Sequence, residues 1–121
     1  MENDNLINEA ETNKTEQSAV ADISVYNHRF ASPFTYEGKT YEELTFEFGK
    51  LTGTDALAIE NELSTLGKMF ISPEFSGEYL VRMAAKACTE PIGADVLSAM
   101  PLREYNRIRN RARSFLLYNG Q

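Results

Sequence analysis

The 121-residue chain has few of the side chains on which most enzymes depend. It contains one cysteine, one histidine and no tryptophan. A single cysteine excludes a disulfide within the chain and suits a reducing cytoplasm. No group of cysteines and histidines has the spacing of a zinc site, and "GKLTGTD" lacks the Gly-Lys-Ser/Thr order of a phosphate-binding loop. The sequence therefore predicts a protein with no catalytic site, no metal and no cofactor.

The rare reactive residues are better explained as structural ones. His28 precedes a candidate edge strand, and we interpret it as a surface or hinge residue, since a general base needs an oriented partner. Cys88 ends an apolar stretch, which favours a small buried hydrophobe over a nucleophile. Glu42 points away from its neighbours on an extended strand, and Glu43 and Glu47 would lie about 13 Å apart on one face. We therefore interpret Glu42, Glu43 and Glu47 as residues of a solvated strand face.

Long apolar runs are also absent. No uncharged apolar run approaches the roughly 18 residues that span a bilayer. The start "MENDN" lacks the positive residues and apolar run of a secretion signal. We therefore expect a soluble intracellular protein with no membrane partner.

The charge of the chain is acidic and unevenly distributed. The formal net charge is −6. Residues 1–62 hold thirteen acids and four bases (−9), whereas residues 63–121 hold five acids and eight bases (+3). An acidic whole argues against a general nucleic-acid binder, which needs a broad positive field.

The apolar residues are concentrated in one region. Residues 1–27 are mostly polar and acid-rich, and they are predicted to form a flexible tail because they cannot bury enough surface to offset the entropy of ordering. Residues 28–121 are predicted to form a single domain. Their expected fold class is α+β, an N-terminal β-hairpin followed by a small bundle of three to four helices.

The hairpin is predicted in "FTYEGKTYEELTFEF", with its turn around Glu37-Gly38-Lys39. Its second strand, residues 41–48, directs Leu44, Phe46 and Phe48 to one face and Glu43 and Glu47 to the other. A hairpin alone is marginal in water, so another element or a partner must cover the aromatic face.

The first hairpin strand is less clear. Pro33 has no amide donor, so that strand should lie at an edge or begin late. Ile23, Val25 and Tyr26 are compatible with a short extra strand before it.

Two helices and a shorter turn or helix are predicted after the hairpin. The first is capped by Thr52 or Thr54 and weakened or ended by Gly67. The second is capped at Ser72, carries Pro73 in its first position and ends before Pro91. It is apolar around most of its circumference, which predicts a central place in the core. "IGADVLSAM" follows as a short helix or turn. The apolar stripe of the first helix contains Ala56, Ile59, Leu63, Leu66 and Phe70.

The last helix, in "PLREYNRIRNRARSFLLYNG", is amphipathic and rich in arginine. Arg103, Arg107 and Arg111 form a row opposite the apolar stripe, and Arg109 and Arg113 flank the stripe. The stripe consists of Leu102, Tyr105, Ile108, Ala112, Phe115 and Leu116.

Three interpretations of these arginines remain open. The first is a solvated outer face, supported by Glu104 near Arg107. The second is a surface that contacts nucleic-acid phosphates. The third is an ionic surface for another protein. The acidic hairpin of a second copy would offer the opposite charge, which makes a homo-oligomer one form of the last interpretation.

The order of these features resembles the small tail assembly chaperones of long-tailed bacteriophages. The resemblance covers residues 28–118, and its best-matching parts are "RFASPFTYEGKTYEELTF" and "EYNRIRNRARSFLL". It implies a non-enzymatic factor in the host cytoplasm that binds the tape measure protein, helps recruit tail tube subunits and is absent from the mature virion. The long polar stretch of the first thirty or so residues is a departure from the family, because such chaperones do not need it.

The surfaces expected to contact a partner are the acidic hairpin face and the apolar flank of the last helix with its arginines. The candidate residues are Glu43, Glu47, Arg103, Arg107, Arg109, Arg111, Arg113 and Phe115. Two other functions compete with this one: a small nucleic-acid-binding regulator, and a structural head–tail or tail component of the virion.

Overall fold

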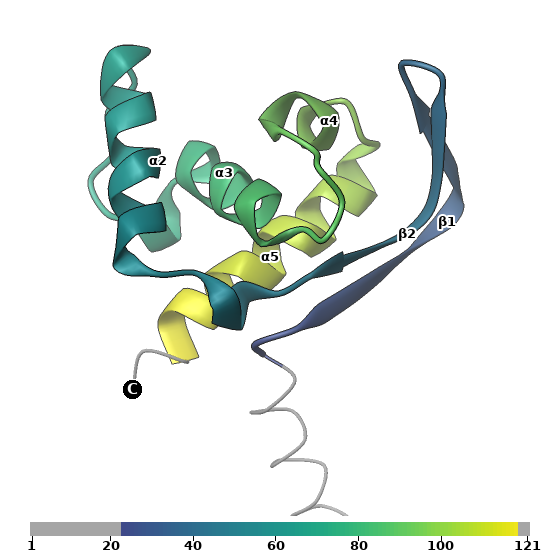
Figure 1. Cartoon of the computed structure of the whole chain (residues 1–121), viewed down its shortest axis with the longest axis horizontal. Helices are drawn as coiled ribbons and strands as arrows, with labels where there is room; N and C mark the ends of the chain where they lie inside the picture. The colour runs from purple at the N-terminus through teal and green to yellow at the C-terminus, as the bar shows by residue number, and fades with distance from the viewer. Residues whose placement is uncertain (1–22, 119–121) are drawn as a thin grey trace, which may run out of the picture.

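The computed structural model describes residues 23–118 as a hairpin followed by helices (Figure 1). The elements are β1 (Tyr26–Tyr36), β2 (Lys39–Phe46), η1 (Phe48–Lys50), α2 (Gly53–Thr65), η2 (Pro73–Phe75), α3 (Gly77–Ala87), α4 (Ala94–Ser98) and α5 (Leu102–Tyr118). The two η elements are short 3-10 turns, and the strands form one antiparallel sheet. The predicted α+β class, a hairpin followed by helices, is confirmed.

The hairpin turn lies where the sequence predicts it. Glu37 and Gly38 both have positive φ, 49° and 82°. A two-residue turn of this kind matches the right-handed twist of the strands it joins. Glycine adopts this conformation at no steric cost.

The first strand is longer than expected and irregular. Tyr26 pairs with Phe46 at one end of the ladder, so the separate extra strand suggested around Tyr26 is wrong. The strand therefore begins two residues before the predicted boundary at residue 28; residues 1–22 of the predicted tail lie outside the described residues. The ladder is regular up to Arg29–Glu43 and resumes at Phe34–Tyr41. Four residues, Pro33 among them, therefore face one residue of β2, and this bulge accommodates the missing amide of the proline.

The aromatic face of the hairpin is covered by the chain's own helices. Leu44, Phe46 and Phe48 are all buried, as predicted. β2 itself ends at Phe46, and Phe48 belongs to η1, so the expected strand over residues 41–48 is two residues too long. The backbone at and just after the end of α3 pairs with this end: Glu47 N–H donates to Ala87 O at 2.7 Å and Thr89 N–H to Thr45 O at 2.9 Å.

Helix α2 begins at the predicted cap, Thr52, and ends just before Gly67, as predicted. Thr52 N–H donates to the Asp55 carboxylate at 2.8 Å, which caps the first turn. Gly67, with φ of 71°, follows the end of the helix. Ile59 and Leu63 are buried, but Leu66 lies beyond the helix and is exposed. The predicted stripe is therefore wrong beyond Leu63.

Helix α3 occupies the centre of the molecule, as its largely apolar circumference predicts. It contacts α2, α4, α5 and β2, and Leu80 and Ala84 are fully buried (Figure 1). Its predicted start is wrong. Ser72 and Pro73 belong to the η2 turn and its cap, and Ser76 Oγ caps α3 by accepting from Tyr79 N–H at 3.1 Å.

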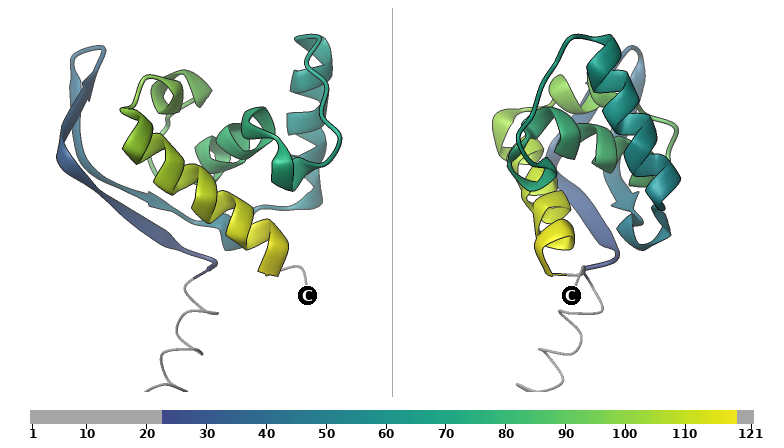
Figure 2. Two further views of the ribbon diagram at one scale, coloured as in Figure 1. Left: turned by 180° about the vertical axis from the view of Figure 1, so that it is seen from behind. Right: turned by 90° about the vertical axis from the view of Figure 1, so that its left-hand side faces the viewer.

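Helix α5 crosses α3, and the hairpin runs beside it in both views of Figure 2. The far end of the hairpin is attached near α4: Tyr36 Oη donates to Asp95 at 2.9 Å, and Lys39 pairs with Glu90 at 3.1 Å. On α5, Ile108 and Ala112 are buried, whereas Leu102 is 71% exposed. The predicted stripe is wrong at Leu102, and Gly120, its expected stop, lies outside the described residues.

Candidate functional site

One exposed charged feature of the described residues is the arginine row, Arg103, Arg107 and Arg111 on α5. All three side chains are exposed, as predicted. No carboxylate of residues 23–118 forms an ion pair with them; the carboxylates there pair with Arg82 and three lysines, and Glu104 lies beside His28. The arginine row therefore presents positive charge that the described part of the chain leaves unneutralised.

The two flanking arginines are part of the structure rather than of a free rim. Arg113 Nε donates to the backbone oxygen of Glu74 at 2.9 Å, which joins α5 to η2. The guanidinium of Arg109 lies 5.7 Å from the centre of the Tyr105 ring, a cation–π distance. Both side chains are half-buried, so they are less available to a partner than the arginine row.

Phe115 lies at the edge of the core. Its ring stacks on the buried Phe48 with centres 5.7 Å apart. With Leu51, Ile59 and Met83 it also lines an apolar hollow of about 250 Å³ between the start of α2 and the end of α5. The predicted apolar flank of α5 therefore consists mainly of side chains that already have partners within the chain.

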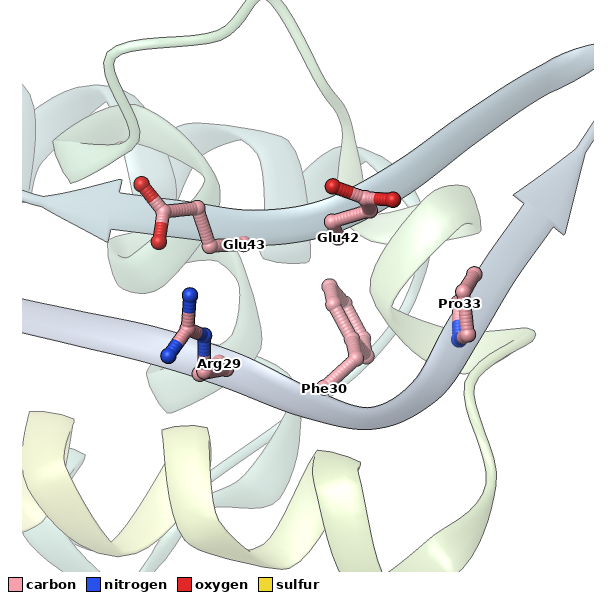
Figure 3. Close-up of a pocket in the computed structure, with 5 residues that line it drawn as sticks. All are labelled: Arg29, Phe30, Pro33, Glu42 and Glu43. Atoms are coloured by element: carbon pink, nitrogen blue, oxygen red, sulfur yellow. The ribbon is translucent and has the colours of Figure 1, made fainter.

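The two predicted hairpin acids do not share a site. Glu43 is exposed on β2 and borders an open hollow of about 490 Å³ at the bulge, together with Arg29 and Glu42 (Figure 3). Glu47 lies beyond the strand, is half-buried and pairs with Lys50 at 2.9 Å. The expected common strand face of Glu43 and Glu47 is wrong because β2 ends at Phe46.

His28 is buried, which corrects the interpretation of it as a surface or hinge residue. Its side chain is 0% exposed. Its Nδ1 lies 2.8 Å from Tyr26 Oη, and its ring meets the Phe30 ring edge-on at 4.8 Å between centres. Tyr26, His28 and Phe30 alternate along β1 with the same burial. That period of two is the signal in the sequence from which the burial of His28 could have been predicted, although the surface interpretation did not use it.

The charged partner of His28 is Glu104 of α5, which is also buried. Glu104 Oε1 lies 3.1 Å from His28 Nε2, close enough for an ion pair but not aligned as a hydrogen bond. Its Oε2 accepts the Ala31 N–H at 3.0 Å, within the β1 bulge. The use of Glu104 as evidence for a solvated helix face was therefore wrong. Its spacing with Ile108 and Ala112, one per turn, was the signal for burial.

The charge state of His28 follows from this environment. Burial lowers the pKa of His28 below its ordinary value of 6.5; the Glu104 carboxylate raises it and the Arg107 guanidinium lowers it, with a net decrease. A carboxylate only accepts, so the proton of the neutral ring belongs on Nε2, and Nδ1 accepts from the Tyr26 hydroxyl. The cluster of Tyr26, His28, Glu104 and the Ala31 amide joins α5 to the hairpin.

The remaining reactive groups have structural surroundings. Burial raises the pKa of the Cys88 thiol, which disfavours the thiolate. Within residues 23–118 no three His, Cys, Asp or Glu side chains are grouped to hold a metal ion. None of the helices described there is long and apolar enough to cross a membrane.

One exposed apolar feature was not predicted: the α2–α3 connection, residues 66–76. Met69 and Ile71 are essentially fully exposed, and Phe75 is 75% exposed. Between them, Phe70 is half-buried against the Tyr79 ring, with centres 5.4 Å apart. Helical periodicity assigned Leu66 and Phe70 to the apolar stripe of α2, but α2 ends at Thr65 and the connection lies outside the helix.

No protein family, curated protein or solved structure with which the chain was compared matches it.

Proposed function

We propose that this protein is a non-enzymatic tail assembly chaperone of a long-tailed bacteriophage. In this role it binds the tape measure protein in the host cytoplasm, helps recruit tail tube subunits and is absent from the finished particle. The proposal rests on the resemblance carried by "RFASPFTYEGKTYEELTF" and "EYNRIRNRARSFLL" together with the exposed α2–α3 connection.

The observation that carries the proposal is the exposure of Met69, Ile71 and Phe75 on one short connection. Clustered exposed apolar side chains are typical of protein-binding surfaces. Burying one such side chain against a partner contributes about 1.5–3 kcal/mol. The partner that fits is the apolar stripe of an amphipathic helix, which docks through side chains spaced by one turn. A methionine adapts to irregular partner surfaces, which suits a chaperone.

The test is co-expression with the tape measure protein encoded by the same phage, followed by purification of a soluble complex. Replacing Met69, Ile71 and Phe75 with serine should weaken the complex at least about tenfold, because exposed apolar anchors dominate such interfaces. The matched control replaces Leu57 and Leu102 with serine, because both are exposed leucines outside the connection. An unaltered protein that binds no tail protein, or a control that weakens the complex equally, would contradict the proposal.

The exposed arginine row favours one alternative, a small nucleic-acid-binding regulator. That function predicts salt-dependent binding, which substitution of the arginine row with alanine would weaken. A gel-shift assay at low salt distinguishes the two functions, since a chaperone should give no retardation. Mass spectrometry of purified particles tests the remaining alternative, a structural virion component, which would be present in them.

A further inference from the structure

The arginine row is an unusual surface for an acidic protein. Its three arginines follow one another at intervals of four residues, and like charges at this spacing destabilise a helix. Within residues 23–118 no carboxylate pairs with them. An anionic partner would remove this repulsion.

The chemistry around the arginine row suits carboxylates. An open hollow of about 340 Å³ is lined by Arg107, Arg111, Asn110, Ser114 and Tyr26. Two guanidiniums, an amide and a hydroxyl offer donors from one side of α5. The planar fork of arginine pairs with both oxygens of a carboxylate. This wall of the molecule therefore fits a segment that carries several acidic side chains.

The chain itself carries such a segment, and it enters beside the hollow. Residues 1–22 contain one base, Lys14, and six acids, a net charge of −5; the acids are Glu2, Asp4, Glu9, Glu11, Glu16 and Asp22. The first described residues lead directly to Tyr26, which forms part of the hollow and lies under the Arg111 guanidinium at 4.7 Å. Gly49 N–H fixes the entry point by donating to Ser24 O at 3.0 Å.

The distances allow this segment to reach every member of the row. Arg103 and Arg111 are eight residues apart on α5, which corresponds to about 12 Å along a helix. A segment of 22 residues can extend over roughly 70 Å. Because it is tethered, its effective concentration at the arginine row is on the order of millimolar, far above that of a free acidic partner.

We infer that the arginine row is the docking surface for the acidic segment 1–22 of the same chain. The ionic contacts neutralise the arginine row and cover the hollow beside Tyr26. Nucleic acid is disfavoured as the occupant, because segment 1–22, with a net charge of −5, is tethered beside the arginine row and would repel its phosphates. The inference is independent of which partner the α2–α3 connection binds.

Paramagnetic relaxation in the full chain tests this inference. A nitroxide is attached to Ala10→Cys in a Cys88→Ala background, and the backbone amides of α5 are observed by NMR. The amides of the arginine row should lose intensity roughly twofold or more, because a tethered segment at high effective concentration is bound much of the time. The signals should recover in 0.5 M salt, and also when the six acids are replaced by Asn or Gln.

Substitutions in the domain distinguish docking from general attraction. Changing Arg103, Arg107 and Arg111 to Gln should abolish the intensity loss along α5. The control changes Arg29, Lys39 and Lys86 to Gln, three exposed bases elsewhere with the same change in net charge, and should leave the loss intact.

Three results would overturn the inference. The first is the absence of an intensity loss along α5; if the protein then retains a DNA duplex at low salt, the arginine row binds phosphates instead. The second is a loss that both sets of substitutions reduce equally. The third is a loss seen only between mixed labelled and unlabelled chains, which would assign the arginine row to a second copy.

Discussion

At the scale of single residues, the buried His28 makes the stability of the protein depend on pH. His28 is the only histidine in the chain, and the groups facing it are Tyr26, Glu104 and Arg107. Burial outweighs the attraction of Glu104, so the pKa of His28 is lower in the folded protein than in water and the neutral ring is favoured.

We therefore predict that stability falls as pH is lowered through 6.5. With its pKa lowered in the folded state, His28 binds a proton more readily in the unfolded chain. The stabilisation is complete above 6.5 and is lost below it, with a slope of at most about 1.4 kcal/mol per pH unit. Urea unfolding between about pH 5 and 8, the range in which an ordinary histidine titrates, measures this change in the free energy of unfolding. His28→Gln should flatten this part of the profile.

NMR provides a direct check of the sign, because the lone imidazole needs no assignment against other histidines. A pKa of His28 above 6.5 would contradict the prediction and show that the attraction of Glu104 outweighs burial.

At the scale of the elements, local signals predicted the existence of each element better than its ends. The Gly38 turn, the Thr52 start of α2 and the short α4 all lie where the sequence places them. The start of α3 does not, because Ser72 and Ser76 are both acceptable caps. The Glu74 oxygen accepts from Arg113 of α5, a contact 39 residues away that no local pattern reveals, and this contact holds residues 73–75 in a separate turn.

The two serines provide a matched pair for testing the cap of α3. Ser76→Ala should lower the free energy of unfolding by about 1 kcal/mol, because the Tyr79 N–H loses its acceptor. Ser72→Ala should change it by less than about 0.5 kcal/mol, because its side chain makes no capping hydrogen bond. Chemical denaturation of the two variants measures the difference. Equal losses would show that η2 and α3 behave as one helix.

At the scale of the whole molecule, the hairpin and the last helix hold each other in place. The opposite ends of the described chain meet where Glu104 of α5 enters the bulge of β1, 73 residues away from Ala31 in sequence. Sequence patterns predicted the aromatic hairpin face, the central apolar helix and the exposed arginine row. They did not predict the buried pair, since neither residue is apolar and each is acceptable inside only because the other is present.

Glu104→Ala should therefore destabilise the whole molecule and not only α5. The substitution leaves the Ala31 amide without its acceptor and removes the carboxylate beside His28 Nε2, which costs about 2–4 kcal/mol. Glu43→Ala, an exposed acid on the same hairpin, should change the free energy of unfolding by less than about 0.5 kcal/mol. Glu104→Gln keeps an acceptor for the Ala31 amide and should fall between them. Urea unfolding followed by both far-UV circular dichroism and tyrosine fluorescence measures all three variants. If the two transitions of Glu104→Ala coincide at a lowered midpoint, His28 and Glu104 join the hairpin and the helices into one cooperative unit. If the circular dichroism or the fluorescence signal is lost at a lower urea concentration than the other, this conclusion is contradicted.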